Sequence, residues 1–265
     1  MRRLSVAAIS AFAFAQVAAP AAAADITTKA EPPLAAPVSF QWAGGVYVGI
    51  NGGYAFGRHH DVTDLETVNG QFSAIGTFGS LEPKGGFGGG QFGVNAWQYG
   101  GWVFGFEADF QAASISDSSA GTVVNFLPGL NATVTSTNKV EAFGTIRPRF
   151  GYAWDRLLIY ATGGFAWGQI RHSFAFADNF NFRAQNSTSG MQAGYVIGGG
   201  LEYGFTRNLS AKAEYQYIDL GSEDYVAPLL FCGIAPCVTT AFVEHTSMRT
   251  NFHTVRLGLN WRWGN

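Results

Sequence analysis

The sequence predicts an all-β fold, an eight-stranded antiparallel transmembrane β-barrel with short periplasmic turns and four long extracellular loops. Three observations predict it. Eight segments alternate in period two between apolar and polar residues, short and long connections follow each other in turn, and aromatic residues gather near the segment ends. Strands of about ten residues that cross a bilayer in a closed barrel have these properties.

The composition excludes several other classes of protein. Charged residues make up 13% of the chain, about half the usual ~25%, while 47% of the residues are hydrophobic and 15% aromatic, too many for a disordered chain. The formal net charge of -2 and the thin spread of Lys and Arg argue against a nucleic-acid partner. No segment after the first 24 residues offers the roughly 18 apolar residues of a spanning helix, so a membrane span requires a closed barrel.

The chain divides into three predicted regions. Residues 1–24 read as a cleaved secretory signal, with Arg2 and Arg3 ahead of an apolar stretch and an alanine-rich cleavage site. Residues 25–44 contain three prolines and are expected to form a Pro-rich periplasmic tether. Residues 45–265 are expected to form the outer-membrane β-barrel.

The alternation defines the strands and the connections between them. The predicted strands lie near 46–57, 86–97, 102–112, 140–154, 157–170, 191–204, 209–219 and 252–263. The short links are 98–101, 155–156 and 205–208, and the long loops are 58–85, 113–139, 171–190 and 220–251. Pro148 interrupts one strand, and because proline removes a ladder donor, a β-bulge is expected there.

Each strand has an apolar and a polar face, and the sequence must indicate which one faces outward. A soluble lipocalin-like barrel would bury the apolar face, whereas a membrane barrel turns it to lipid. Aromatic residues near strand ends suit interfacial girdles, and the glycines on the polar face leave room for charged side chains in a narrow lumen. The membrane barrel is favoured, with Phe104, Phe150, Leu257 and Leu259 facing lipid.

The polar face predicts a network of charged side chains in the lumen. Its members are Glu107, Asp109, Glu141, Arg147, Arg149, Glu202, Lys212, Glu214, Arg256 and Arg262. The interior of an eight-stranded barrel is only wide enough for side chains, and buried charges are tolerated when they are paired. The network is therefore expected to plug the lumen, and the alternative is a selective ion path through an open lumen.

The long loops contain the cysteines and most of the histidines. Cys232 and Cys237 are the two cysteines of a chain with a secretory signal, so a disulfide is expected. The adjacent His59 and His60 are weak candidates for binding a transition metal or haem iron, the alternative being two solvated histidines. No spacing supports a Ser, His and acid site, so no catalytic residue is assigned and an enzyme is not expected.

Several stretches resemble one family. They are Gly44 to Gly57 (GGVYVGINGGYAFG), Gly88 to Val94 (GGGQFGV), Trp102 to Gln111 (WVFGFEADFQ), Phe143 to Tyr152 (FGTIRPRFGY), Leu157 to Phe165 (LLIYATGGF), Glu214 to Gly221 (EYQYIDLG) and His253 to Trp263 (HTVRLGLNWRW). Together they resemble the small outer-membrane β-barrel proteins of alphaproteobacteria, labelled porin-family or outer-membrane immunogenic proteins. The resemblance implies an eight-stranded barrel in the outer membrane of a Gram-negative cell, surface exposure, antigenicity and, in some members, haem binding.

The functional expectation follows from these observations together. The leading hypothesis is a structural outer-membrane protein that displays surface loops and contributes to envelope integrity and surface interaction. The alternatives are a small-solute porin and a surface haem- or metal-binding protein. Expected partners are outer-membrane lipid and lipopolysaccharide, and the barrel assembly machinery through the C-terminal strand. No nucleic acid is expected, and no cofactor other than the haem that the resemblance allows.

Overall fold

The computed structural model describes residues 40–57, 62–67, 73–77, 82–124, 131–233 and 236–263, and all regular structure in these ranges is β-strand. The strands are β1 (Val46–Phe56), β2 (Val62–Thr67), β3 (Ser73–Thr77), β4 (Lys84–Tyr99), β5 (Trp102–Val124), β6 (Asn131–Trp154), β7 (Leu157–Asp178), β8 (Phe182–Gly204), β9 (Leu209–Phe231) and β10 (Val238–Trp263). Within these ranges no helix is long and apolar enough to cross a membrane. The predicted signal lies outside the described residues, as does the tether up to residue 39.

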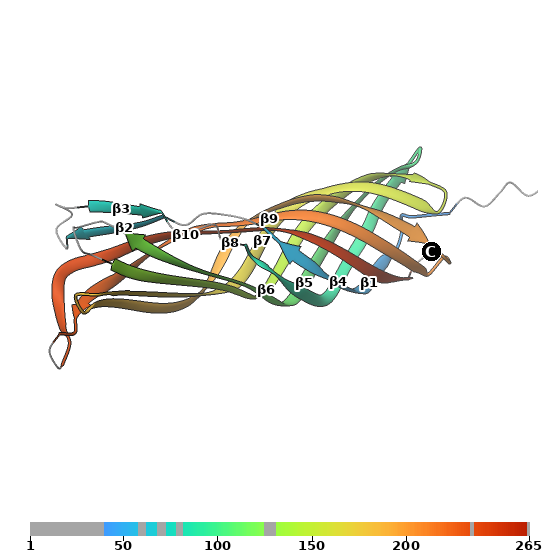
Figure 1. Cartoon of the computed structure of the whole chain (residues 1–265). Coiled ribbons are helices and arrows are strands. Elements are labelled where there is room, and N and C mark those ends of the chain that lie inside the picture. Colours follow the sequence, from blue (N-terminus) through green and yellow to red (C-terminus); the bar gives the residue numbers. More distant parts are fainter. Residues whose placement is uncertain are drawn as a thin grey trace, which may run out of the picture. The chain divides into compact units, whose positions relative to one another are not determined.

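Eight of the strands form a closed antiparallel ring. Its order is β1-β4-β5-β6-β7-β8-β9-β10, and β1 pairs with β10 along its whole length to complete the circle (Figure 1). The short strands β2 and β3 form a hairpin that pairs with the part of β10 farther from its C-terminal end. Closure satisfies every ladder group at the level of the membrane, which a chain in lipid requires. The predicted eight-stranded barrel is confirmed.

Three short turns lie at one end of the ring, as predicted. Gly100 and Gly101 join β4 to β5, and both have positive φ, 56° and 90°, as the tightest hairpin turns require. Asp155 and Arg156 join β6 to β7, with Asp155 at φ 48°. Residues 205–208 join β8 to β9. Outer-membrane barrels keep their short turns in the periplasm, so we expect this end to be the periplasmic one.

At the other end the strands run far beyond the membrane. The six strands β5 to β10 have 22 to 26 residues, whereas a tilted strand needs only about 9 to 11 to cross the bilayer. The predicted long loops are therefore in large part hairpin strands. The segment 113–139 illustrates the reason, because it is rich in Ser, Thr and Val, and its residues 115–124 pair one by one with residues 131–140 across β5 and β6.

The predicted β-bulge at Pro148 is absent, and a bulge lies elsewhere in β6. Pro148 pairs in register with Phe106 of β5, and the pairing with β7 keeps one register on both sides of the proline. Pro148 therefore lacks a backbone N–H for the hydrogen-bond ladder, but it does not change the pairing register of the strand. The register with β7 shifts instead between Val140 and Ala142. An extra residue at a bulge reverses which side chains face the lumen beyond it.

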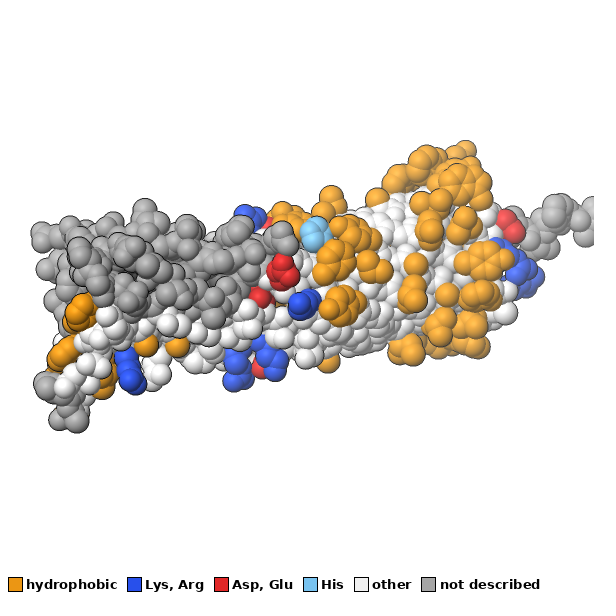
Figure 2. Space-filling view, in the orientation of Figure 1, with side chains coloured by type: hydrophobic (Ala, Val, Ile, Leu, Met, Phe, Trp, Pro, Cys, Tyr) orange, Lys and Arg blue, Asp and Glu red, His pale blue; other side chains and the backbone are white. Residues whose placement is uncertain are grey.

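The two faces of the ring have the polarity of a membrane barrel. Large apolar side chains point outward, among them Ile50, which is 70% exposed, and Leu257, which is 67% exposed. Figure 2 shows apolar side chains gathered on the outside of the barrel toward the end where Figure 1 marks the C-terminus. Phe150 and Leu259 are exposed on the same outer face. The inner face is polar or charged at the same level, the reverse of a soluble barrel.

Candidate functional site

The lumen of the ring holds a cluster of buried charged side chains. Nine of the ten residues predicted for the network have buried side chains. They are Glu107 and Asp109 on β5, Arg147 and Arg149 on β6, Glu202 on β8, Lys212 and Glu214 on β9, and Arg256 and Arg262 on β10. Strand alternation points them inward, and the curvature of the ring brings strands far apart in the sequence within contact distance.

Arg147 lies between three carboxylates. Its Nη2 donates to Glu107 Oε1 at 2.6 Å and to Asp109 Oδ2 at 2.9 Å, both on the neighbouring strand β5. Its Nη1 donates to Glu214 Oε1 at 2.9 Å, on β9. Since β6 and β9 are not neighbours in the ring, this last contact spans the lumen.

Two further cations bind the same carboxylates. Arg256 of β10 donates Nη1 to Asp109 Oδ2 at 3.0 Å and also hydrogen-bonds Glu214. Lys212 Nζ donates to Glu107 Oε1 at 2.6 Å. Three acids and three bases thus share one set of contacts, in which each carboxylate accepts from at least two cations. Such pairing is what allows charge to be buried.

A second group of charges lies around Glu202. Arg149 Nη2 donates to Glu202 Oε2 at 2.5 Å, and Arg262 Nη2 donates to Glu202 Oε1 at 2.7 Å. The hydroxyl of Ser210 and the amide of Asn260 donate to the same Oε1 at 2.6 Å and 2.9 Å. Two cations from β6 and β10 therefore converge on one carboxylate of β8.

Two tyrosines that the sequence reasoning missed join these groups. The Tyr47 hydroxyl donates to Glu107 Oε2 and accepts from Arg149 Nη1, both at 2.8 Å. The Tyr160 hydroxyl donates to Glu214 Oε2 at 2.6 Å, and the Arg149 guanidinium lies 4.2 Å from the centre of its ring. Both tyrosines occupy inward positions of their strands, and this alternation was the signal that could have found them.

Glu141 is the exception, and its assignment to the lumen is wrong. Its side chain is partly exposed and pairs with two outward cations, Lys139 Nζ at 3.7 Å and Arg171 Nε at 3.3 Å. The physical reason is the register shift between Val140 and Ala142, since one extra residue reverses the alternation that the strand follows on either side. The described lumen network thus contains four carboxylates and five cations.

The end of the lumen with the short turns is filled by residues that precede β1. Trp42 is 1% exposed, and its Nε1 donates to the backbone oxygen of Asp155 at 2.9 Å. The backbone N–H groups of Trp42 and Ala43 both donate to Gln98 Oε1, at 2.8 Å and 3.1 Å. The Arg262 guanidinium lies 4.0 Å from the centre of the Trp42 ring, a cation–π contact. The last residues of the predicted tether thus contact the barrel.

An apolar layer fills the lumen on the side of the charges that faces the long hairpins. It consists of Ala55, Phe87, Ile115, Val140, Phe143, Ala166, Ile170, Val196, Ile218, Leu220 and Phe252. Phe143 contacts two other aromatic rings of the layer, with ring centroids 5.2 Å from Phe87 and 5.6 Å from Phe252. Trp42 with its contacts, the charged network and the apolar layer therefore occupy successive levels of one lumen.

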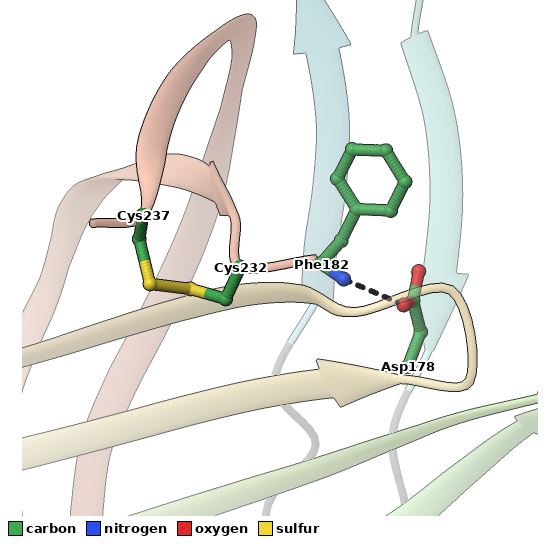
Figure 3. Close-up of a disulfide and its surroundings, with 4 residues drawn as sticks. All are labelled: Asp178, Phe182, Cys232 and Cys237. Atoms are coloured by element: carbon green, nitrogen blue, oxygen red, sulfur yellow. Dashed lines mark hydrogen bonds between the residues drawn. A yellow bond between two sulfur atoms is a disulfide. The ribbon is translucent and has the colours of Figure 1, made fainter. Parts of the chain in front are cut away.

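The two cysteines form a disulfide between the ends of β9 and β10. The Cα atoms of Cys232 and Cys237 are 4.3 Å apart, and Figure 3 shows the bridge beside the turn between β7 and β8. The Cys232 N–H donates to the backbone oxygen of Asn181 at 2.8 Å. In that turn the Phe182 N–H donates to Asp178 Oδ1 at 2.8 Å (Figure 3). The bridged loop thus contacts the neighbouring hairpin.

The histidines supply no metal site within the described residues. His59 and His60, the weak candidates for metal or haem, lie outside those residues. His172 is buried in the lumen beyond the apolar layer, where its Nε2 lies 3.2 Å from Gln192 Nε2. Among the side chains that the structure describes, no group of three or more His, Cys, Asp or Glu could hold a metal ion.

Comparison with known proteins identifies the family. The model of the outer membrane protein beta-barrel domain matches residues 4–262. The chain belongs to this family. Its members are proteins of the Gram-negative outer membrane, so the predicted localisation and the resemblance to small alphaproteobacterial barrels are confirmed.

Two outer-membrane relatives agree with this assignment. The 31 kDa outer-membrane immunogenic protein of Brucella melitensis is 39% identical over 262 residues, covering 94% of this chain and 96% of the relative. The 22 kDa outer membrane protein of Rhizobium leguminosarum is 32% identical over 151 residues, 57% of this chain and 61% of the relative. Among solved structures, OprG of Pseudomonas aeruginosa has a TM-score of 0.48 at 12% identity, covering 84% of this chain and 98% of that one.

Proposed function

We propose that this outer membrane protein is a non-conducting anchor that displays β-hairpins outside the cell and contributes to the integrity of the envelope. The observation that carries the proposal is the filling of the lumen at three levels. Trp42 and its contacts fill the periplasmic mouth, the charged network fills the middle, and the apolar layer fills the extracellular half.

The three levels oppose the passage of ions for different reasons. An ion in the middle of the lumen would have to displace guanidinium and carboxylate groups that already bind one another at 2.5 to 3.0 Å. In the apolar layer it would lose its hydration without gaining a polar partner, which is how hydrophobic constrictions exclude ions. A porin would need both levels to be open.

Display is supported by the length of the strands. Six strands continue past the apolar band, so the extracellular part is a set of paired hairpins on a rigid base. Binding residues concentrate on such exposed connections. The Brucella relatives are named immunogenic proteins, a name that fits exposure at the cell surface.

Two partners belong to this proposal. The barrel assembly machinery would act on the C-terminal strand β10, which closes the ring by pairing with β1. Outer-membrane lipid and lipopolysaccharide would surround the outward apolar band. Neither catalysis nor a resident cofactor forms part of the proposal.

Conductance of the purified full-length protein in planar lipid bilayers tests the closed lumen. The wild-type protein is expected to give no stable single-channel current. Arg147→Ala combined with Glu107→Ala is also expected to stay closed, because the apolar layer remains, and so is Phe143→Ala, because the network remains. Leu257→Ala on the lipid face is the matched control. Large and stable wild-type currents would establish the porin alternative.

A further inference from the structure

A row of basic and hydroxyl side chains crosses the outward face of the extracellular half of the ring. The row follows direct strand pairings: Lys84 opposite Ser116, Ser116 opposite Lys139, Lys139 opposite Arg171, and Arg171 opposite Ser189. All five residues are exposed. Direct neighbours in such a row have Cα atoms about 4.5 to 5.5 Å apart, so the side chains can act on one ligand together.

Within the part of the chain that the structure describes, the central pair of this row, Lys139 and Arg171, has one carboxylate for two cations. The two side chains share a single carboxylate, Glu141, at 3.7 Å and 3.3 Å, and remain 46% and 54% exposed. By contrast, Arg249 on the outer surface of β10 has a carboxylate of its own, Asp219, at 2.5 Å. Two cations beside one acid therefore leave a net positive site that faces outward.

The pair lies at the level of lipid head groups. On β7 the outward positions proceed from Phe165 to Trp167 and then, two positions farther out, to Arg171. The Trp167 ring covers Gly144 of β6, and aromatic side chains of this kind mark the membrane interface. Four residues of a strand tilted by about 40° rise roughly 10 Å, which places Arg171 beyond the hydrocarbon. Figure 2 shows basic and acidic side chains at this edge of the apolar band.

We propose that Lys139 and Arg171 form a binding site for the phosphate groups of an outer-leaflet glycolipid. A guanidinium binds phosphate through two parallel hydrogen bonds, an ammonium adds a point charge, and the flanking Ser116 and Ser189 hydroxyls can donate as well. The acyl chains of the same lipid would lie along the apolar band directly below. A free phosphate ion would contact only the basic and hydroxyl side chains and leave the apolar band unused. The arrangement of the two surfaces therefore favours the lipid. The site rests on the proposed extracellular placement of the hairpins, and it does not depend on a closed lumen.

The test is a titration of the full-length protein in detergent micelles with lipid A carrying two phosphates, measured by native mass spectrometry. The wild type is expected to prefer this lipid to its dephosphorylated form. In Lys139→Gln combined with Arg171→Gln, affinity is expected to fall about thirtyfold at low ionic strength, since each basic residue near a lipid surface contributes about 1 kcal/mol. Arg183→Gln combined with Arg207→Gln removes the same charge from exposed sites elsewhere, and is expected to change affinity less than twofold.

Glu141→Gln provides a test of opposite sign that removes no cation. Binding of the bisphosphorylated lipid should tighten about fivefold, because the carboxylate no longer competes for Lys139 and Arg171. If the double variant does not show the heat-modifiable gel mobility of a folded barrel, the Glu141→Gln variant alone tests the proposal. Equal binding of both lipid forms, an equal loss in the control, unchanged affinity in Glu141→Gln, or full displacement by millimolar inorganic phosphate would each overturn the proposal.

Discussion

Single side chains in the lumen act through one another, and Arg147 shows this most directly. It contacts Glu107, Asp109 and Glu214, so its removal leaves three buried carboxylates with fewer cations. The cost of a missing partner in such a network exceeds what the pair itself contributes to stability, because the remaining charge stays desolvated. Residues of the lumen are therefore far more sensitive to substitution than their distance from any ligand would suggest.

Arg147→Met is expected to lower the free energy of unfolding by about 3–5 kcal/mol. Urea unfolding in lipid vesicles, followed by tryptophan fluorescence, measures this change. The matched control is Arg183→Met at an exposed position of β8, which should stay within about 0.5 kcal/mol of the wild type. Equal effects of the two substitutions would contradict the role given to the network.

On the outward face, the cost of a substitution depends on whether it places a charge in the hydrocarbon of the membrane. Leu257 is 67% exposed in the apolar band, so Leu257→Arg would place a charge in hydrocarbon and is expected to cost about 2–4 kcal/mol. Gln169→Arg, on the outward face of β7 beyond Trp167, should cost only about 0–1 kcal/mol. The same vesicle assay compares them. Tolerance of arginine at Leu257 would show that this face does not contact lipid.

At the scale of elements, the hairpin of β9 and β10 ends in a loop closed by a covalent bond. Its Cys232–Cys237 bridge lies beside the turn between β7 and β8, far from the membrane-spanning part of either strand. Because the bridge joins two nearby residues and lies far from the ring, we expect it to constrain the tip of the hairpin and not the ring.

The peptide that contains Cys232 and Cys237 should weigh two hydrogens less before reduction than after it, in protein taken from the native envelope. Cys232→Ser combined with Cys237→Ser should keep the heat-modifiable mobility of the barrel while proteolysis of the hairpin tip becomes faster. Mass spectrometry and gel electrophoresis measure the two effects. Two alkylatable thiols in untreated protein would rule out the bridge.

The elements also show how far sequence alone could predict this structure. Alternation assigned Arg147, Glu214 and their neighbours to the lumen, because a closed sheet forces every second residue inward. It failed at Glu141, since a bulge adds one residue and nothing in the local sequence marks it. It also missed Trp42, whose burial depends on contacts with Gln98 and Asp155, far away in the sequence. The outer strands read as loops because polar residues occupy both of their faces, with Lys139 and Arg171 outward and Asn138 and His172 inward, which weakens the apolar alternation.

At the scale of the whole molecule, the even number of ring strands fixes which ends face the same side. The residues preceding β1 and the C-terminal end of β10 lie at the end with the short turns, and the long hairpins extend from the opposite end. The proposed display of these hairpins therefore predicts a clear asymmetry toward reagents outside the cell.

Protease treatment of intact cells should cut within the β5–β6 or β9–β10 hairpins, in 113–139 or 220–251, and leave Glu31 to Pro37 intact. Mass spectrometry of the released peptides identifies the cuts. Cells with a permeabilised outer membrane serve as the control, in which the segment before β1 should also be cut. Cleavage of that segment on sealed cells, with the hairpins spared, would invert the orientation.

The distribution of the lumen charges over distant strands has a consequence for how the barrel is made. Arg147 of β6 meets Glu214 of β9, and Arg256 of β10 meets Asp109 of β5, contacts that exist only after the sheet has curled on itself. A single hairpin entering lipid would keep only the pairs within it, such as Arg147 with Glu107 and Asp109, and would lack the partners on distant strands, at a cost of several kcal/mol for each missing partner. Stepwise insertion of hairpins is therefore strongly disfavoured. We expect the strands to cross the bilayer together, in a cooperative step that closes the ring and completes the charge pairing.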